Sequence, residues 1–310
     1  MKNLLSMADF SASDTNELLV RARYLKKNRR LSKALAGQTL GMIFQKPSTR
    51  TAVSFAVAMH ELGGLALTLN DQQLQLHRGE TMADTARTLS RYLAGVMIRA
   101  NQHADVVELA QHATIPVVNG LTDQEHPCQV LADLMTISEV FNIKTLKGFK
   151  GFRVLYVGDG NNMAHSWLLA AGTLGLELVV ASPQGYQPSQ DFMKRSEALA
   201  RVSGARLTLT SDPLEAARGA RVIYTDVWTS MGQEAEVVRR QRIFRPYQVN
   251  QKLLANAHPK AIVMHCLPAH RGEEITSDVL DGPQSVVFDQ AENRLHVQKA
   301  ILLKLLEKKR

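Results

Sequence analysis

The sequence predicts an α/β fold with two doubly wound parallel-sheet domains. Short apolar runs rich in β-branched residues alternate with longer amphipathic stretches along almost the whole chain, the pattern of strands that are each followed by a helix. Repeats of this kind form parallel sheets with helices on both faces. The chain has 310 residues, which exceeds one typical domain and suits two. A glycine-punctuated segment, Lys147–Gly151, separates two series of repeats.

Nine apolar runs are predicted to be strands. They are Thr39–Phe44, Gly64–Leu69, Gly95–Arg99, Ile115–Asn119, Arg153–Gly158, Leu176–Ser182, Arg206–Thr210, Arg221–Thr225 and Ala261–His265. Predicted helices include Thr81–Tyr92, Ala104–His112, Val130–Phe141, Ala164–Leu174, Asp191–Val202 and Ala291–Lys308. We expect residues 1–142 to form the first domain and residues 143–289 the second. The last helix has no strand after it, so residues 290–310 are assigned to the first domain.

The composition is that of an ordinary globular protein, with 45% apolar and 21% charged residues. No run of about 18 consecutive apolar residues occurs, so no membrane span is expected. The sequence shows no signal peptide and has only two cysteines, Cys128 and Cys266, which predicts a cytoplasmic protein without a disulfide scaffold. The net charge of +8 would suit a nucleic-acid binder. The basic residues are spread along the chain, however, and we expect anionic small substrates and no nucleic acid.

Polar clusters follow six of the predicted strands, at the edge where parallel sheets bind ligands. The clusters are Ser48–Thr51, Arg99, His126, Asn161–Asn162, Asp226 and His265–Cys266. Ser48-Thr49-Arg50-Thr51 also precedes a helical pattern, and backbone N–H groups at a helix start bind anions. Hydroxyls add donors, and Arg50 adds a bidentate fork for phosphate. A simple helix cap is the alternative, but one Ser or Thr would suffice for it.

The remaining clusters each allow a functional and a structural interpretation. His126 begins a helix with Pro127 and is expected to act as a neutral donor beside Gln129, or to be an ordinary loop histidine. The segment 158–162 (GDGNN) lacks the third glycine of a dinucleotide-binding loop, and its asparagines suit a carboxylate or amide. Asp226 suits a substrate ammonium or a helix cap, and the following Ser230–Gly232 is interpreted as a mobile loop.

The segment His265–Gly272 (HCLPAHRG) allows two sharper chemical hypotheses. Cys266 could be a thiolate nucleophile with His126 as its base across space. A metal site is the second hypothesis, but the spacing of two histidines and one cysteine matches no standard zinc site. The structural alternative is a strand-end loop packed by Leu267 and Pro268.

Taken in order, these segments resemble the transcarbamoylase family, and most closely its ornithine carbamoyltransferase branch. The segments that match are PSTRT, MIRA, HPCQ, GDGNN-MAHS, DVWTSMGQE, HCLPAHRGEEI and AENRLHVQKA, and they cover nearly the whole chain. The resemblance implies an aspartate/ornithine carbamoyltransferase-like fold and transfer of the carbamoyl group from carbamoyl phosphate to the side-chain amine of L-ornithine. It also implies a homotrimer or a multiple of trimers, with no cofactor and no metal.

The resemblance assigns roles to individual residues. Ser48, Thr49, Arg50 and Thr51 would hold the phosphate, and Arg99, His126, Gln129 and Arg294 the carbamoyl end, with Thr51 also directed at the carbonyl. Asn162, Asp226, Ser230 and Met231 would bind the α-amino and α-carboxylate groups of ornithine, and Cys266 and Leu267 would orient its attacking amine. Gln72 would reach the site of a neighbouring subunit. Of these, Arg50, Arg99, His126, Cys266 and Arg294 are the expected catalytic residues.

Three positions depart from the family pattern. Ala52 and Ala56 stand where the family usually has an arginine and a glutamate, a pair four residues apart on one helix face. Because both partners are replaced, neither charge is orphaned, and we expect intact phosphate contacts on an altered helix face. His77 stands where glycine is more usual. The alternatives are a sister transcarbamoylase that uses another amine, such as putrescine or aspartate, and a weakly active paralogue that binds carbamoyl phosphate.

Overall fold

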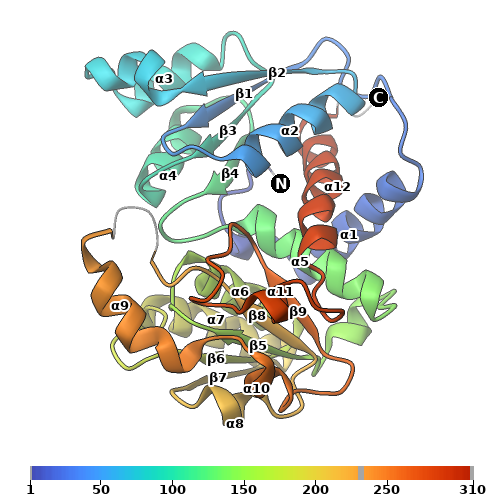
Figure 1. Cartoon of the computed structure of the whole chain (residues 1–310). Coiled ribbons are helices and arrows are strands. Elements are labelled where there is room, and N and C mark those ends of the chain that lie inside the picture. The colour runs from blue at the N-terminus through green and yellow to red at the C-terminus, as the bar shows by residue number, and fades with distance from the viewer. Residues whose placement is uncertain (1, 230–233, 308–310) are drawn as a thin grey trace. The chain divides into compact units, whose positions relative to one another are not determined.

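The computed structural model describes residues 2–229 and 234–307, and Figure 1 traces the chain through them. The chain divides into two compact units. Unit 1 consists of Met1–Met135 and Glu292–Arg310, and unit 2 consists of Thr136–Ala291. The divisions fall within two continuous helices, α5 (Pro127–Val140) and α12 (Val287–Leu306).

Unit 1 is built on a parallel sheet of four strands in the order β2-β1-β3-β4. The strands are β1 (Thr39–Phe44), β2 (Leu65–Asn70), β3 (Gly95–Arg99) and β4 (Val117–Leu121). The helices before α5 are α1 (Ala12–Lys27), α2 (Thr49–Glu61), α3 (Met82–Leu89) and α4 (His103–His112). Short 3-10 turns occupy Met7–Asp9, Asp71–Gln73 and Gln75–Arg78.

The core of unit 1 forms where two helices pack on one face of this sheet. Ile43, Val96 and Ile98 from β1 and β3 are buried against Val106 and Leu109 of α4, and α3 joins the same cluster. The last turns of α12 also reach the sheet, because a Cβ added at Gly95 would lie only 2.9 Å from Leu306 Cδ2. A glycine in β3 therefore allows this helix to approach the strand closely.

Unit 2 is built on a parallel sheet of five strands in the order β7-β6-β5-β8-β9. The strands are β5 (Arg153–Val157), β6 (Glu177–Ala181), β7 (Arg206–Thr210), β8 (Val222–Thr225) and β9 (Ile262–His265). The helices are α6 (Asn162–Leu174), α7 (Gln190–Ser203), α8 (Pro213–Ala217), α9 (Val237–Phe244), α10 (Gln251–Leu254) and α11 (Ser277–Leu280). Short 3-10 turns lie at Leu146–Phe149, Glu234–Glu236 and Arg245–Tyr247.

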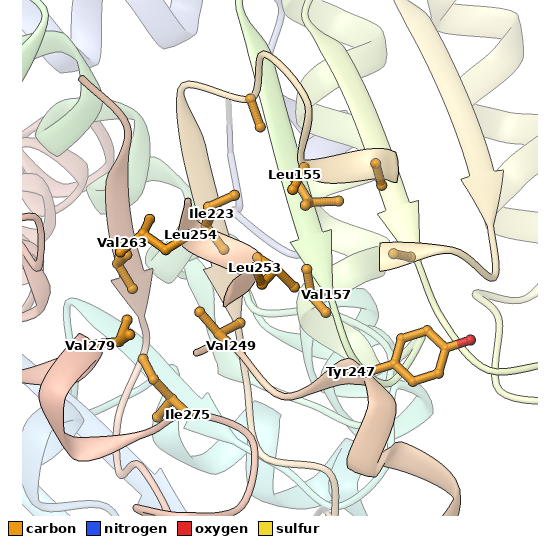
Figure 2. Close-up of a cluster of buried hydrophobic side chains, with 14 of the residues drawn as sticks. Leu155, Val157, Ile223, Tyr247, Val249, Leu253, Leu254, Val263, Ile275 and Val279 are labelled. Atoms are coloured by element: carbon orange, nitrogen blue, oxygen red, sulfur yellow. The ribbon is translucent and has the colours of Figure 1, made fainter. Parts of the chain in front are cut away.

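Helices cover both faces of the second sheet because alternate strand residues point to opposite sides. Leu155 and Ile223 face a cluster that includes Leu253 of α10 and Val279 of α11, as Figure 2 shows. Tyr224, the neighbour of Ile223, belongs to the other face. Its ring stacks on Tyr156, with centroids 5.8 Å apart, and meets Trp167 of α6 edge-on at 5.5 Å. The result is a helix–sheet–helix layering within unit 2.

The predicted fold class is confirmed. Each of the nine predicted strands forms within the described chain, with ends shifted by at most two residues. Helix α1 was not among the predicted helices, and α12 begins at Val287, before the predicted start at Ala291. None of the helices described is both long and apolar enough to cross a bilayer.

Candidate active site

Each sheet has a switch point, where the chain winds outward in opposite directions from two neighbouring strands. In unit 1 the switch point lies between β1 and β3, and in unit 2 it lies between β5 and β8. Ligands of doubly wound sheets bind beyond the carboxyl ends of the strands at this position. Phe44 pairs with Arg99 at the end of β1 and β3, and Val157 pairs with Thr225 at the end of β5 and β8. Each unit therefore has its own candidate site at the carboxyl ends of its strands.

Helix α2 begins directly beyond β1 and carries the predicted anion site. Ser48 is its N-cap, and the Ser48 hydroxyl accepts a hydrogen bond from the Thr51 backbone N–H at 3.3 Å. The first turn contains Thr49, Arg50 and Thr51 and no carboxylate. The helix dipole and the N–H groups of this turn favour an anion. Ser48 is thus both a helix cap and part of the predicted site.

A buried hydrogen-bonded network joins the start of α2 to α5 and α12 within unit 1. Arg294 is only 3% exposed. One of its terminal nitrogens donates to Gln129 Oε1 at 2.7 Å, and the other donates to Thr51 Oγ1 at 3.0 Å. The Gln129 amide in turn donates to Asp133 Oδ1 at 2.8 Å. Three predicted site residues from separate parts of the sequence are therefore joined, because Arg294 contacts both Gln129 and Thr51.

His126 lies buried at the start of α5, surrounded by positive charge. Burial lowers the pKa of His126 well below its ordinary value, and the charges of Arg294, Arg99 and Arg50 lower this pKa further. The imidazole is therefore neutral at pH 7, as predicted from its place at a helix start. A neutral imidazole can donate one hydrogen bond without adding a fourth positive charge to the cluster.

Cys128 is a packing residue in the same unit. Burial raises the pKa of the Cys128 thiol to about 12. The thiol donates to the Asn119 backbone carbonyl at 3.4 Å. A thiol in this environment is not a nucleophile at neutral pH.

In unit 2 the loop after β5 brings Asn161 to the end of β8. A Cβ added at Gly160 would lie 2.1 Å from the Pro188 backbone nitrogen, so only glycine fits as the loop passes this segment. The Asn161 side-chain oxygen caps α6 and also accepts from the Tyr156 hydroxyl at 2.9 Å. Its amide nitrogen donates to Asp226 Oδ2 at 2.9 Å. Asn161 is therefore a support for Asp226, while the predicted ligand Asn162 is half-buried in the first turn of α6.

Asp226 is the centre of the polar cluster in unit 2. Its Oδ1 accepts from the Val227 backbone N–H at 2.9 Å and from the Cys266 thiol at 3.0 Å. With Asn161 on its other oxygen, the carboxylate is fixed by three donors. Asp226 and Cys266, which directly follow β8 and β9, are thereby brought together at the sheet edge where the sequence placed both. A fixed carboxylate beside a thiol suits the binding of an ammonium group.

Two further charged residues of this cluster were not predicted from the sequence. Arg240 of α9 is buried and forms an ion pair with Asp159 in the loop after β5. Arg240 also donates to the Trp228 carbonyl at 2.6 Å, two residues beyond Asp226. Burial raises the pKa of Asp159 to about 6, and the charge of Asp226 adds to the rise while Arg240 opposes it. Asp159 lies inside the GDGNN motif, whereas nothing in the sequence marks Arg240.

Two groups of the described side chains have the spacing of a possible metal site: His270, Glu273 and Glu274 form one, and the other lies in the cluster around Asp226. Ligand atoms of Asp226, His265 and Cys266 lie within 4.8 Å of one another. The His265 ring does not suit this use, because Nδ1 accepts from the Leu267 backbone N–H at 2.8 Å and Nε2 lies 3.1 Å from Glu274 Oε1. A metal ligand needs one ring nitrogen with an available lone pair. This cluster therefore fits hydrogen bonding rather than metal binding.

Some predicted site residues stand apart from these clusters. Ser230 and Met231 lie outside the described residues. Gln72 is exposed in the 3-10 turn after β2. Leu267 follows Cys266 beyond β9, and its backbone has a positive φ of 58°.

The fold and the two clusters define a class of protein: a two-unit α/β protein with a helix start suited to an anion in one unit and a fixed carboxylate suited to an ammonium group in the other. The family model of the aspartate/ornithine carbamoyltransferase carbamoyl-P binding domain matches residues 2–139, and that of the Asp/Orn binding domain matches residues 150–305. The chain belongs to the aspartate/ornithine carbamoyltransferase family.

Individual relatives match over nearly their whole length. The anabolic ornithine carbamoyltransferase of Pyrococcus furiosus is 55% identical over 305 residues, which are 97% of this chain and 95% of the relative. A solved structure of ornithine carbamoyltransferase from the same organism has a TM-score of 0.93 and covers 100% of this chain and 98% of its own. The Bacillus subtilis ornithine carbamoyltransferase is 52% identical over 308 residues, 99% of this chain and 94% of the relative.

Proposed function

We propose that this protein transfers the carbamoyl group of carbamoyl phosphate to the side-chain amine of L-ornithine, giving L-citrulline and phosphate. The observation that carries the proposal is the cluster in unit 1. A helix start with Arg50 lies with Arg99 and Arg294 around a neutral, buried His126. This set of groups suits an anionic substrate that also contains a polarised carbonyl. The ornithine carbamoyltransferases named above support the choice of acceptor.

Carbamoyl phosphate is assigned to unit 1. Ser48, Thr49, Arg50 and Thr51 hold the phosphate at the start of α2, where the dipole and N–H groups favour it. Arg99, His126, Gln129 and Arg294 hold the carbamoyl end. Gln129 and Arg294 already form one network with Thr51, so the two ends of the substrate are bound by connected groups.

L-Ornithine is assigned to unit 2. Asn162, Asp226, Ser230 and Met231 bind its α-amino and α-carboxylate groups, and the fixed carboxylate of Asp226 suits the α-ammonium. Cys266 and Leu267 orient the side-chain amine. Cys266 acts here as a neutral hydrogen-bonding thiol that donates to Asp226, and no step requires it as a nucleophile.

The reaction is an acyl transfer to nitrogen. The neutral side-chain amine attacks the carbamoyl carbon, a C–N bond forms, and negative charge grows on the carbonyl oxygen. Arg50, Arg99, Thr51 and His126 are donors already placed for this charge, and they stabilise the transition state more than the ground state. The C–O bond then breaks, its electron pair leaves with the phosphate, and the attacking nitrogen gives up one proton to the departing phosphate. Phosphate is an activated leaving group, so the proposal includes no metal and no organic cofactor.

The proposal extends to organisation and assembly. Residues 1–142 with 290–310 form the carbamoyl-phosphate-binding domain, and residues 143–289 form the ornithine-binding domain. We infer a cytoplasmic homotrimer, or a multiple of trimers, in which Gln72 reaches a neighbouring subunit. The exposed position of Gln72 in the 3-10 turn after β2 supports this role.

The proposed function is tested by product formation from carbamoyl phosphate with L-ornithine, putrescine and L-aspartate in parallel. We expect a ureido product with ornithine alone. Turnover of putrescine or aspartate would move the protein to a sister activity. Binding of carbamoyl phosphate without any product would favour the weakly active paralogue.

A variant pair tests the anion site itself. Arg50→Ala should lower turnover at least about 100-fold, because a transition-state donor and a phosphate ligand are both lost. Arg87→Ala is the matched control, since Arg87 is an exposed arginine on α3 in the same unit, paired with Asp84. Turnover of Arg50→Ala within a few-fold of the parent would contradict the assignment.

A further inference from the structure

The backbone beyond β9 is held in a shape that its sequence does not favour. Leu267 has a φ of 58°, in the left-handed region that bulky residues other than glycine rarely adopt. Such a conformation persists where neighbouring groups hold it, and it recurs at functional sites. Leu267 is also one of the two residues assigned to the ornithine side-chain amine.

His265 holds Leu267 directly. The His265 side chain is 0% exposed, and its Nδ1 accepts a hydrogen bond from the Leu267 backbone N–H at 2.8 Å. Because Nδ1 is the acceptor, the proton of the neutral ring is on Nε2. Nε2 lies 3.1 Å from Glu274 Oε1, so the ring donates to this carboxylate.

The loop that follows β9 spans residues 266–274. Glu274, at its far end, completes the arrangement. Its side chain is also 0% exposed, and the same oxygen accepts from the His270 backbone N–H at 2.6 Å. One buried carboxylate therefore fixes the orientation of the His265 ring and the middle of the loop together. The hydrogen bonds run in series from Glu274 through His265 to the backbone of Leu267.

We propose that His265 and Glu274 are positioning residues that hold Leu267 in the conformation that receives the side-chain amine of the second substrate. The inference deepens the proposed function and depends on ornithine as that substrate. Neither residue contacts substrate in this scheme. Both act through the backbone beside Cys266.

The loop has separate anchors that distinguish this role from general support. The Gln248 amide donates to the carbonyls of Gly272 and Glu273 at 2.8 and 2.9 Å, and Gln241 donates to the Glu273 carboxylate at 3.1 Å. These contacts hold the later part of the loop without His265. Loss of the His265 contact should therefore act locally, on Leu267, while the rest of the loop stays in place.

Two substitutions at His265 test the roles of its two ring nitrogens separately. In His265→Asn the side-chain oxygen takes the place of Nδ1 and can still accept from the Leu267 N–H. In His265→Gln the amide reaches the place of Nε2 and the acceptor for Leu267 is lost. We expect His265→Gln to raise the KM for ornithine about tenfold or more, and His265→Asn to stay within about threefold of the parent.

Glu274 offers an equivalent pair of variants. Glu274→Gln keeps an acceptor oxygen for His265 and His270, whereas Glu274→Leu removes it. The leucine variant should raise the KM for ornithine about tenfold, and the glutamine variant should restore a value near that of the parent. Gln248→Ala is the control, because it removes an anchor of the same loop. It should lower the melting temperature and leave the KM for ornithine within about twofold.

L-Norvaline provides the readout that a merely structural role would not change. It has the carbon skeleton of ornithine and lacks the side-chain amine. His265→Gln should raise the KM for ornithine about tenfold. The inhibition constant of norvaline and the KM for carbamoyl phosphate should each change less than about twofold. The inference would be overturned if the KM for ornithine and the inhibition constant of norvaline rose by the same factor. It would also be overturned if His265→Gln and His265→Asn changed the KM for ornithine equally.

A measurement without catalysis separates this inference from the proposed function. Hydrogen exchange of the Leu267 amide should be faster in His265→Gln than in the parent and in His265→Asn. Unchanged exchange would overturn the positioning role even in an active enzyme. A parent protein that forms no citrulline would instead overturn the proposed function, and with it the assignment of ornithine to this loop.

Discussion

Arg294 shows at the scale of one residue how a buried charge is used in this fold. Its guanidinium donates hydrogen bonds to the side-chain oxygens of Gln129 and Thr51. Removal of Arg294 therefore leaves two buried acceptors without this donor and also removes a charge. We expect Arg294→Leu to lower the free energy of unfolding by about 1–3 kcal/mol for each unpaired group that water does not reach. The same variant should raise the KM for carbamoyl phosphate. Denaturant unfolding and steady-state kinetics measure the two effects.

Arg294→Lys tests whether charge alone is sufficient. Lysine keeps the charge but cannot donate to Gln129 and Thr51 in the same fork geometry. We expect an intermediate KM. A lysine variant equal to the parent in both measurements would show that the network is not needed.

His126 gives a second prediction, on the pH dependence of stability. Its pKa in the folded protein lies well below the ordinary value of 6.5. At pH values between the folded-state pKa and 6.5, the unfolded chain binds a proton that the folded chain does not. The free energy of unfolding therefore falls as the pH falls through this range. The slope from this residue is at most about 1.4 kcal/mol per pH unit. His126→Gln should remove it.

Melting temperatures at pH 7.5 and pH 5.5 check this expectation. The difference between the two should be smaller in His126→Gln than in the parent. His60→Gln is the control, because His60 is exposed in the last turn of α2 in the same unit. A parent and a His126 variant with equal pH dependence would show that His126 is charged or accessible in the folded state.

Single residues of the site were predictable where their chemistry is local. Ser48 and Arg50 stand at one helix start, and Asp226 and Cys266 each directly follow a strand. The supporting residues were not predictable in the same way. Arg240 and Glu274 act through partners that the fold brings together, and no local pattern distinguishes them from other charged residues.

At the scale of elements, the strands were predictable because each is a short run rich in aliphatic or β-branched residues between polar segments, even though β2 and β7 are largely exposed. Helix α1 was missed because only a narrow stripe of it is buried, Thr15, Leu18, Leu19 and Ala22 among sixteen residues. Its polar face resembles a loop in composition. The structure shows a helix start that is capped by Ser11 and Asp14, a signal that a search for capping boxes would have found.

Helix α2 carries the departure from the family pattern and gives a third prediction. Ala52 and Ala56 are half-buried positions four residues apart, and Ala52 directly follows the last residue of the proposed anion site. Restoring the pair as Ala52→Arg with Ala56→Glu should stabilise the helix by at most about 0.5 kcal/mol. Turnover should stay within about twofold, because the residues proposed to bind the phosphate end at Thr51. A tenfold gain in citrulline formation would show instead that the alanines impair the site.

Helix α9 gives a fourth prediction, because Arg240 links it to the loop after β5 and to the Trp228 carbonyl. The pKa of Asp159 is raised to about 6, so this carboxyl takes up a proton in the folded protein as the pH falls below that value. Protonation weakens its pair with Arg240 and loosens the segment beside Asp226. We expect the affinity for norvaline, measured with carbamoyl phosphate present, to fall between pH 7 and pH 5.

In Asp159→Asn the side chain at position 159 is neutral at every pH and mimics the protonated carboxyl of the parent. Its affinity for norvaline should match that of the parent at low pH and should not change between pH 5 and pH 7. Norvaline suits the measurement because its own groups do not titrate in this range. Asp191→Asn, at an exposed carboxylate of α7, is the control and should retain the behaviour of the parent. A pH-dependent Asp159→Asn would assign the titration to another group.

At the scale of the whole molecule, two parallel-sheet units follow from two series of strand–helix repeats. The division of the chain is less evident in the sequence. Glycines mark Lys147–Gly151, whereas the compact units divide within α5 and α12, which contain no internal glycine or proline. A helix that runs from one unit into the next carries no local signal at the point of division. Composition and periodicity predict single helices and strands. The division of the chain into units depends on which helices and strands pack against one another.

The assignment of one substrate to each unit gives the last prediction, which uses hydrogen exchange across the full chain. Inorganic phosphate alone should slow exchange at the start of α2 and near His126. A ligand present at about 100 times its Kd suppresses opening of its site by about 2.7 kcal/mol, or roughly 100-fold. Norvaline added to the phosphate-bound protein should then slow exchange near Asn161 and Asp226. Chloride at equal ionic strength controls for screening. Protection by phosphate confined to the loops of unit 2 would reverse the assignment of the substrates, because the helix start at Ser48 would then not be the site that binds the phosphate.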